Sequence, residues 1–147
     1  MRRYIEVPIQ LLDIEGDGFH IMVQGKIHGK EAHFLIDTGA SRSVFDPNTI
    51  TDFINVIQFE KKQGMTAGVG SSDLESSTFI IDNFSIGNLE IHNYEAVALD
   101  LENIHEMYAK LALPHIDGIL GGDLLKKYKA VINYRNKKLR LTPPLSF

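Results

Sequence analysis

The residues most able to do chemistry are Asp37-Thr38-Gly39, which end an apolar run in residues 33–41 (HFLIDTGAS). A carboxylate at the end of a buried strand is costly unless hydrogen bonds or a matching group hold it. The Thr38 hydroxyl can supply one such bond, and Gly39 permits a tight backbone turn. A carboxylate held in this way can act as a general base, so Asp37 is the first candidate for catalysis.

A second apolar run, residues 116–122 (IDGILGG), follows about eighty residues later and ends in the glycine pair Gly121-Gly122. We predict that both runs are buried strands and that the second one leads into a helix. Three residues such as Asp-Thr-Gly recur by chance, whereas the two motifs in this order and at this separation form a specific pattern.

Together the two motifs resemble those of the aspartic proteases, in particular the single-lobed retropepsin type, and the resemblance spans residues 19–141. In that family the two strands cross in a psi-shaped arrangement beneath the catalytic carboxylate. The resemblance implies a mostly β, closed-barrel-like fold with a psi-loop and one or two short helices. It also implies that Asp37, Thr38 and Gly39 are the catalytic residues, and that neither a cofactor nor a metal takes part.

The chemistry of that family needs two carboxylates that share one proton, because adjacent like charges cannot both ionise. This chain has one Asp-Thr-Gly, so we expect a homodimer whose two-fold axis places the two Asp37 side chains opposite each other. Thr38 should then bond across the axis, and Ala40 and Ser41 should line the floor of the site. The Ser41 hydroxyl either bonds the outer oxygen of Asp37 or completes the turn.

Asp117 is the rival carboxylate within the same chain. Asp-Gly directly before Ile-Leu-Gly also recurs in aspartic protease lobes away from the catalytic position, so we interpret Asp117 as structural. The terminal strands that interleave in viral dimers have no clear counterpart here, because Pro143-Pro144 cannot donate to a strand ladder. The dimer contact is therefore expected either to use other elements or to be weak.

Substrate binding is expected under a hairpin over residues 60–78, which corresponds to the flap of the retropepsin pattern. Its glycine-rich tip contains Ala67, Gly68, Val69 and Gly70, whose backbone amides can bond the main chain of a substrate. An ordinary loop is the alternative interpretation of this segment. On the floor, Ile119 and Leu120 are the candidate apolar contacts for a peptide bound as an extended strand.

Short strands with turn residues between them dominate the rest of the chain, which predicts a single domain over residues 1–147 with an N-terminal strand extension over 1–18. Strands are expected at residues 4–14, 19–25, 30–36, 44–45, 77–82, 89–99, 130–134 and 138–142. Helical segments are expected at 46–49, with Asp46 as the N-cap and Pro47 at the first position, at 102–113, and at 122–128, where Asp123 opens the helix.

Composition excludes several classes of protein. A chain of 147 residues with 44% hydrophobic and 23% charged residues is an ordinary globular domain. The net charge of −4 gives no broad basic face for nucleic acid, and the Lys and Arg residues over 126–140 are interpreted as a solvated helix and hairpin. The absence of cysteine excludes disulfides and thiol catalysis. Without an apolar run of membrane-spanning length or a signal-peptide pattern, we expect a cytoplasmic protein with no membrane partner.

We therefore predict an aspartic endopeptidase that acts on peptides or proteins as a homodimer. One alternative is a catalytically silent dimerisation or peptide-binding module of the same fold, because a fold does not guarantee activity. A second alternative is a metal hydrolase that uses some of the six histidines with Asp37, although no pair of histidines has metal-motif spacing.

Overall fold

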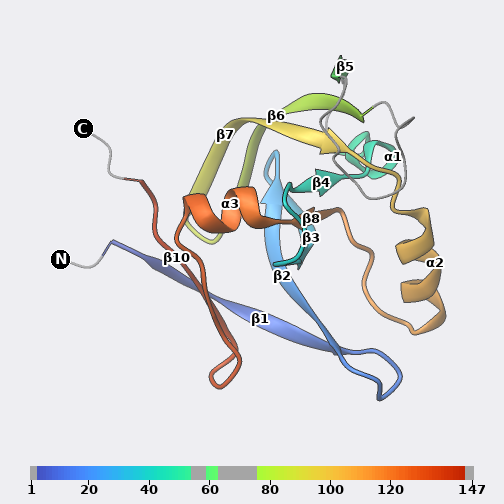
Figure 1. The fold of residues 1–147 in the computed structure, drawn as a ribbon, viewed down its shortest axis with the longest axis vertical. Helices are drawn as coiled ribbons and strands as arrows, with labels where there is room; N and C mark the ends of the chain where they lie inside the picture. Colours follow the sequence, from blue (N-terminus) through green and yellow to red (C-terminus); the bar gives the residue numbers. More distant parts are fainter. Residues whose placement is uncertain (1–2, 54–58, 63–75, 145–147) are drawn as a thin grey trace.

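The computed structural model describes residues 3–53, 59–62 and 76–144, which are coloured along the sequence in Figure 1. Six of the described strands close a barrel in the order β2-β3-β8-β4-β7-β6, because β6 returns to pair with β2 at Phe84 and Ile27. The bounds of these strands are β2 (Phe19–Ile27), β3 (Lys30–Ile36), β4 (Val44–Phe45), β6 (Ser76–Ile86), β7 (Leu89–Ala98) and β8 (Gly118–Leu120). The prediction of a mostly β, closed-barrel-like fold is confirmed.

The psi-shaped crossing is formed by β8 and the two strands on either side of it. β8 runs parallel to β3 and antiparallel to β4, and β3 and β4 are joined by residues 37–43. The later strand therefore passes between two earlier strands that the Asp37 loop connects. This arrangement places the loop at the carboxyl ends of both β3 and β8.

Four further strands extend the sheet beyond the barrel. They are β1 (Ile5–Asp13), β5 (Phe59–Lys62), β9 (Val131–Asn133) and β10 (Lys138–Leu141). The second half of β1 pairs with β2, while its first half leaves the barrel and pairs with β10, which in turn pairs with β9 (Figure 1). Within the described ranges β9 is the last strand on that side of the sheet, so one of its edges is unpaired.

The described helices are short and lie outside the barrel: α1 (Pro47–Ile50), α2 (Glu102–Lys110) and α3 (Gly122–Lys127). The Asp46 side chain caps α1 by accepting from Asn48 N–H at 2.8 Å, and Pro47 takes the first helical position, as the sequence predicts. No helix in the described part of the chain is both long and apolar enough to cross a membrane.

The main core fills the barrel with aromatic rings packed edge to face. The centroid of Phe84 lies 5.9 Å from that of Phe34 and 5.6 Å from that of Phe45, and all three rings are fully buried. A second cluster lies between the barrel and α2, where Leu35 and Ile119 pack with Tyr108. The two clusters lie on opposite faces of the β3–β8 pair, since successive side chains of a strand alternate between faces.

Three predicted boundaries were wrong. The helix over 102–113 ends at Lys110, because Ala112 adopts a φ of +56° and Leu113 N–H bonds back to Tyr108 O at 2.8 Å. The β2–β3 hairpin turns at His28-Gly29, where both residues have positive φ, so β2 runs on to Ile27, beyond its predicted end at residue 25. The strand predicted over 77–82 spans Ser76–Ile86, because Phe84 and Ile86 belong to the main core.

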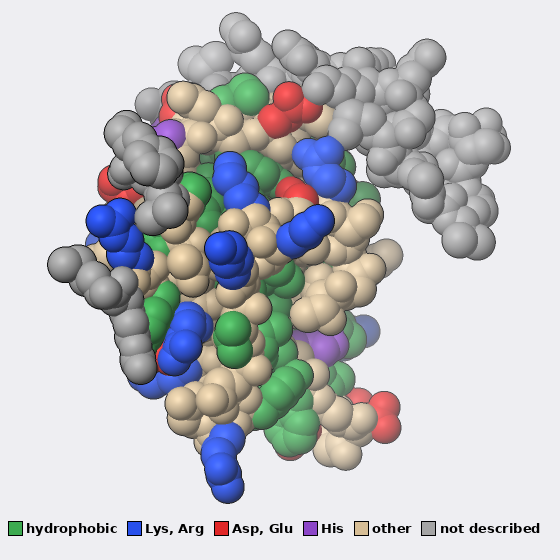
Figure 2. Space-filling view, turned by 60° about the vertical axis from the view of Figure 1, so that its left-hand side comes forward, with side chains coloured by type: hydrophobic (Ala, Val, Ile, Leu, Met, Phe, Trp, Pro, Cys, Tyr) green, Lys and Arg blue, Asp and Glu red, His purple; other side chains and the backbone are tan. Residues whose placement is uncertain are grey.

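Lys and Arg side chains are spread over the face of the molecule shown in Figure 2, with other surface between them. Lys126, Lys127 and Lys129 at the end of α3 are exposed to solvent. Arg140 on β10 lies 3.5 Å from the Glu6 carboxylate and 4.0 Å from the centroid of the Tyr4 ring. The exposed lysines agree with the interpretation of residues 126–140 as a solvated helix and hairpin, whereas Arg140 is half-buried and paired.

Candidate active site

Asp37 follows the last residue of β3 and is held by its backbone and its side chain. Its N–H donates to Leu120 O at 2.9 Å, which extends the parallel pairing of β3 and β8 by one residue. Gly39 N–H donates to the Asp37 carboxylate at 2.9 Å, and Ala40 N–H donates to Asp37 O at 3.2 Å. The carboxylate is therefore oriented by its own turn, while the Asp37 side chain remains exposed to solvent.

The loop after Asp37 is fastened to the start of α3. Ala40 O accepts from Gly122 N–H at 2.7 Å, and Ser41 O accepts from Asp123 N–H at 3.1 Å. A Cβ atom at Gly121 would lie 2.7 Å from Ala40 O and 2.8 Å from the carbonyl oxygen of Arg42. The motif needs glycine at this position because the loop backbone occupies the space of a side chain.

The Asp123 side chain makes several of the bonds that hold the Asp37 loop against α3, and the sequence did not reveal that role. One carboxylate oxygen accepts from Ser43 N–H at 2.8 Å and from the Ser43 hydroxyl at 2.7 Å, and the other accepts from the Tyr94 hydroxyl at 2.5 Å. The Arg42 guanidinium lies 3.5 Å from Asp123. Ser43 also accepts from Gly121 N–H at 2.9 Å. The prediction that Asp123 opens α3 was wrong, because the N-cap is Gly121 and the carboxylate turns back to the Asp37 loop.

Hydrogen bonds favour the charged form of Asp123. Burial alone would raise the pKa of this carboxyl, but bonds from Tyr94, Ser43 and the backbone N–H groups of Leu124 and Ser43 outweigh burial and lower it. Burial, and next the Asp123 carboxylate, raise the pKa of Tyr94, so its hydroxyl stays protonated and keeps donating.

The lowered pKa predicts how stability depends on pH. A carboxylate with a depressed pKa in the folded state stabilises the fold above its unfolded pKa of about 4 and loses this effect as the pH falls through the folded value. We expect Asp123→Asn to lower the free energy of unfolding at pH 7. The gap, which is the difference in this free energy between wild type and the variant, should become smaller below about pH 4. Urea unfolding of both proteins between pH 3 and pH 7 measures the gap. A gap that stays constant over this range would contradict this role of Asp123.

Asp117 lies away from Asp37. Its carboxylate accepts from His33 N–H at 2.8 Å, and its own N–H donates to His33 O at 2.8 Å. His33 is four residues before Asp37 along β3, a separation of about 13 Å in an extended strand. Asp117 is buried, and His115 Nδ1 lies 3.6 Å from its other oxygen. These contacts agree with the interpretation of Asp117 as structural.

An apolar groove of about 480 Å³ opens beside Asp37 and Thr38. The wall on the α2 side is formed by Ile104, Ile119 and His20. The opposite wall is formed by Ile132 of β9 and by Tyr134, which directly follows β9. The groove is completed by the β2 and β3 residues Phe19, Ile21, Leu35 and Ile36. The structure thus brings Ile119 to the same groove as Asp37 and Thr38.

The other predicted contacts have different places. The Leu120 side chain is 2% exposed and packs into the main core. Leu120 therefore contacts Asp37 through its backbone carbonyl, which accepts from Asp37 N–H. The Ser41 side chain is exposed, and within the described residues the bond to the Asp37 carboxylate comes from Gly39 rather than from Ser41.

The predicted flap lies partly outside the described residues. The tip residues Ala67, Gly68, Val69 and Gly70 belong to the segment that the structure does not describe. The two strands on either side, β5 and β6, pair antiparallel from Phe59↔Phe79 to Lys62↔Ser76. The structure therefore pairs the strands on either side of this segment, and the flap itself stays a prediction.

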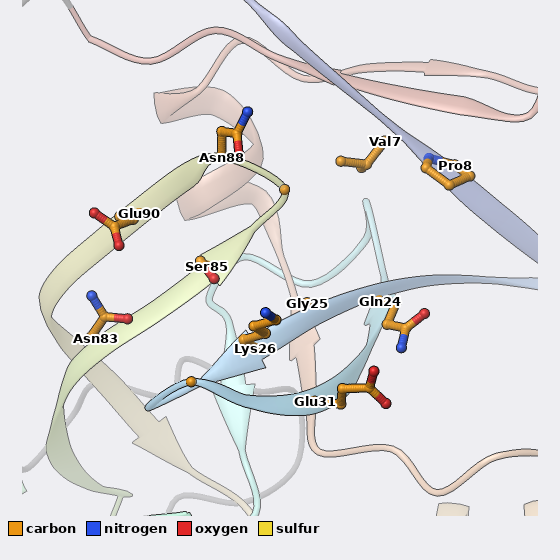
Figure 3. Close-up of a pocket in the computed structure, with 12 residues that line it drawn as sticks. Val7, Pro8, Gln24, Gly25, Lys26, Glu31, Asn83, Ser85, Asn88 and Glu90 are labelled. Carbon is orange, nitrogen blue, oxygen red and sulfur yellow. The ribbon is translucent and has the colours of Figure 1, made fainter.

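A larger cavity of about 740 Å³ lies at the other end of β2 (Figure 3). Gln24, Lys26 and Glu31 line it together with Asn83 and Glu90 from the β6–β7 hairpin. These side chains are polar and of mixed charge, Val7 and Pro8 of β1 also line the cavity, and Asp37 does not. Among the described residues, no group of three or more His, Asp or Glu side chains is arranged to hold a metal ion.

Comparisons with known proteins agree with this geometry. A family model described as aspartyl protease matches residues 23–124. The fold is similar to the crystal structure of a retropepsin-like aspartic protease from Rickettsia conorii, with a TM-score of 0.55 and 16% identity over 97% of this chain and 93% of that one. It is also similar to the retroviral protease-like domain of Ddi1 from Leishmania major, with a TM-score of 0.53 and 17% identity over 85% of this chain and 93% of that one.

A search of curated proteins gives no match. The family match covers more than half of the chain and includes the Asp37 loop, β8 and the start of α3. The chain therefore belongs to the aspartyl protease family and has the retropepsin-like fold.

Proposed function

We propose that the protein is an aspartic endopeptidase whose active site forms when two copies bring their Asp37 carboxylates together across a two-fold axis. The observation that carries this proposal is that Asp37 is exposed, although its turn is fixed by β8 and α3 and opens on an apolar groove. A single carboxylate in this position lacks the partner with which it would share a proton. A second copy supplies that partner and covers the exposed turn.

In this proposal the two Asp37 side chains divide the acid and base roles. The ionised carboxylate accepts a proton from water, which attacks the peptide carbonyl, and the protonated carboxyl donates to the carbonyl oxygen. Gly39 N–H orients the carboxylate, and the Asp123 bonds keep the loop in position. Thr38 and Ser41 are assigned to the axis and the floor, Ile119 to substrate contact, and the β5–β6 hairpin to closure over the bound peptide.

Peptide digestion tests the proposal directly. Purified protein incubated with a mixture of peptides should produce internal cleavages that mass spectrometry identifies, and a chelator should leave their rate unchanged. Loss of cleavage with the chelator would favour the metal hydrolase. A dimer that cleaves no peptide between pH 3 and pH 8 would favour the catalytically silent module.

The exposed aromatic side chain of Tyr134 lies on the groove beside Thr38 and is expected in the dimer contact. Tyr134→Asp places a charge on this surface and should weaken the dimer by about thirty-fold or more, as loss of a central interface residue does. Ile80→Asp is the matched control, because Ile80 is 48% exposed, comparable to the 58% of Tyr134, and does not line the groove. Sedimentation velocity measures both variants, and equal weakening by the two substitutions would contradict the assignment.

A further inference from the structure

A hydrogen-bonded pair, His20 and Tyr108, is built into the wall of the groove that faces α2. Tyr108 belongs to the second cluster, which also contains Ile119. His20 lines the groove and lies between this cluster and solvent, since its side chain is half-buried. The neighbouring side chains of this wall, Ile104 and Ile119, are hydrocarbon, so the imidazole is its polar feature.

The contact between the two side chains fixes the orientation of the imidazole. His20 Nδ1 lies 2.6 Å from the Tyr108 hydroxyl oxygen, and the two rings stack with centroids 5.8 Å apart and planes inclined by 28°. Tyr108 is 1% exposed, and burial raises its pKa to about 12, so the hydroxyl keeps its proton.

The same contact assigns the tautomer of His20. A buried hydroxyl needs an acceptor, and within the described residues the acceptor available to Tyr108 is His20 Nδ1. Because Nδ1 accepts, the proton of the neutral imidazole is on Nε2. Nε2 has no hydrogen-bond partner in the described part of the chain, so it presents an N–H donor on the wall of the groove.

We propose that His20 determines specificity by donating from Nε2 to an amide side chain, Gln or Asn, placed close to the scissile bond of the substrate. The inference rests on the proposed function and names the substrate class of the same site. An amide oxygen satisfies the donor within an apolar groove, whereas an apolar side chain leaves it unpaired. A carboxylate is disfavoured because it would bring a further negative charge beside Asp37. Tyr108 acts as a positioning residue, since it reaches the substrate through His20.

The experiment compares two peptides that are identical except for Gln or Met at one position, because these side chains have similar length and shape. The parent sequence is taken from the cleavage sites found in the peptide mixture, and each of the two positions beside the scissile bond is varied in turn. We expect wild type to prefer Gln over Met in kcat/KM, and His20→Phe to reduce this ratio by about ten-fold, the value of one hydrogen bond. Tyr108→Phe should reduce the ratio in the same direction by freeing the ring.

His92→Phe is the control, since His92 is an exposed histidine of β7 that does not line the groove. It should leave the Gln to Met ratio unchanged. If wild type and His20→Phe cleave with the same Gln to Met ratio, the inference is overturned and the proposed function is left intact. The same conclusion follows if His92→Phe reduces the ratio as much as His20→Phe does. If His20→Phe does not fold, an unchanged ratio in Tyr108→Phe overturns it. Failure of wild type to cleave any peptide would overturn the proposed function, and this inference with it.

Discussion

Replacing Asp37 with Asn should reduce peptide cleavage by about a thousand-fold or more, because acid and base roles of this kind contribute about a hundred- to ten thousand-fold each. The amide has the shape of the carboxylate but cannot accept a proton from water. Gly39 N–H can still donate to the amide oxygen, so the turn keeps its bond and the fold should be unchanged. Initial rates on one peptide, with urea unfolding of the same preparations, measure both expectations.

Asp117→Asn is the comparison for this result. Asp117 accepts from His33 N–H and lies beside His115, so the substitution weakens a buried contact and should lower the free energy of unfolding by about 1–2 kcal/mol. The rate of cleavage by the folded protein should stay near that of wild type. If Asp117→Asn were stable and inactive while Asp37→Asn still cleaved, the two roles would have to be exchanged.

Mixing wild type with inactive subunits should reduce the activity of the wild-type subunits themselves. In a pool with nine Asp37→Asn subunits for each wild-type subunit, random pairing leaves about one wild-type subunit in ten with a wild-type partner. Activity per wild-type subunit should therefore fall by about ten-fold once the subunits have exchanged, because a mixed dimer holds one ionisable carboxylate and cannot share a proton. The measurement is the rate at fixed wild-type concentration after incubation with the variant.

The double variant Asp37→Asn with Tyr134→Asp provides the control for mixing. Because its dimer contact is weakened, the double variant should pair poorly with wild-type subunits. The same excess should therefore reduce wild-type activity much less. Equal inhibition by both variants would indicate competition for the peptide instead of exchange of subunits. Undiminished activity with the single variant would place the whole active site within one chain.

The fold was predictable because its signals are local in the sequence. Neighbouring residues alone mark two strand ends: Asp-Thr-Gly follows one apolar run, and the glycine pair follows the other. They also mark a helix start, where Pro47 follows the capping residue Asp46. The boundaries that were wrong depend on tertiary packing. β6 continues to Ile86 because Phe84 and Ile86 fill the barrel, and a local pattern does not show which residues they meet there.

The turn that contains Asp37 and Gly39 was predictable, but the contacts that fix this turn were not. The bonds from Ser43 and Tyr94 to Asp123 join segments that are 80 and 29 residues apart. No periodicity or spacing links such residues, because the barrel topology alone brings them together. One signal was available: α3 begins at Gly121-Gly122 without a capping side chain, so an Asp in its first turn was free to bond elsewhere. The His20–Tyr108 pair joins residues 88 apart and was hidden for the same reason.

The most direct test of the central claim is the specific activity of the wild-type protein as a function of its concentration, measured together with its mass by analytical ultracentrifugation. If Asp37 of two copies forms the active site, cleavage per subunit should be constant where the protein is a dimer. It should fall in proportion to the dimer fraction as dilution passes the dissociation constant. A protein that is monomeric at every concentration and cleaves with constant specific activity would contradict the shared site.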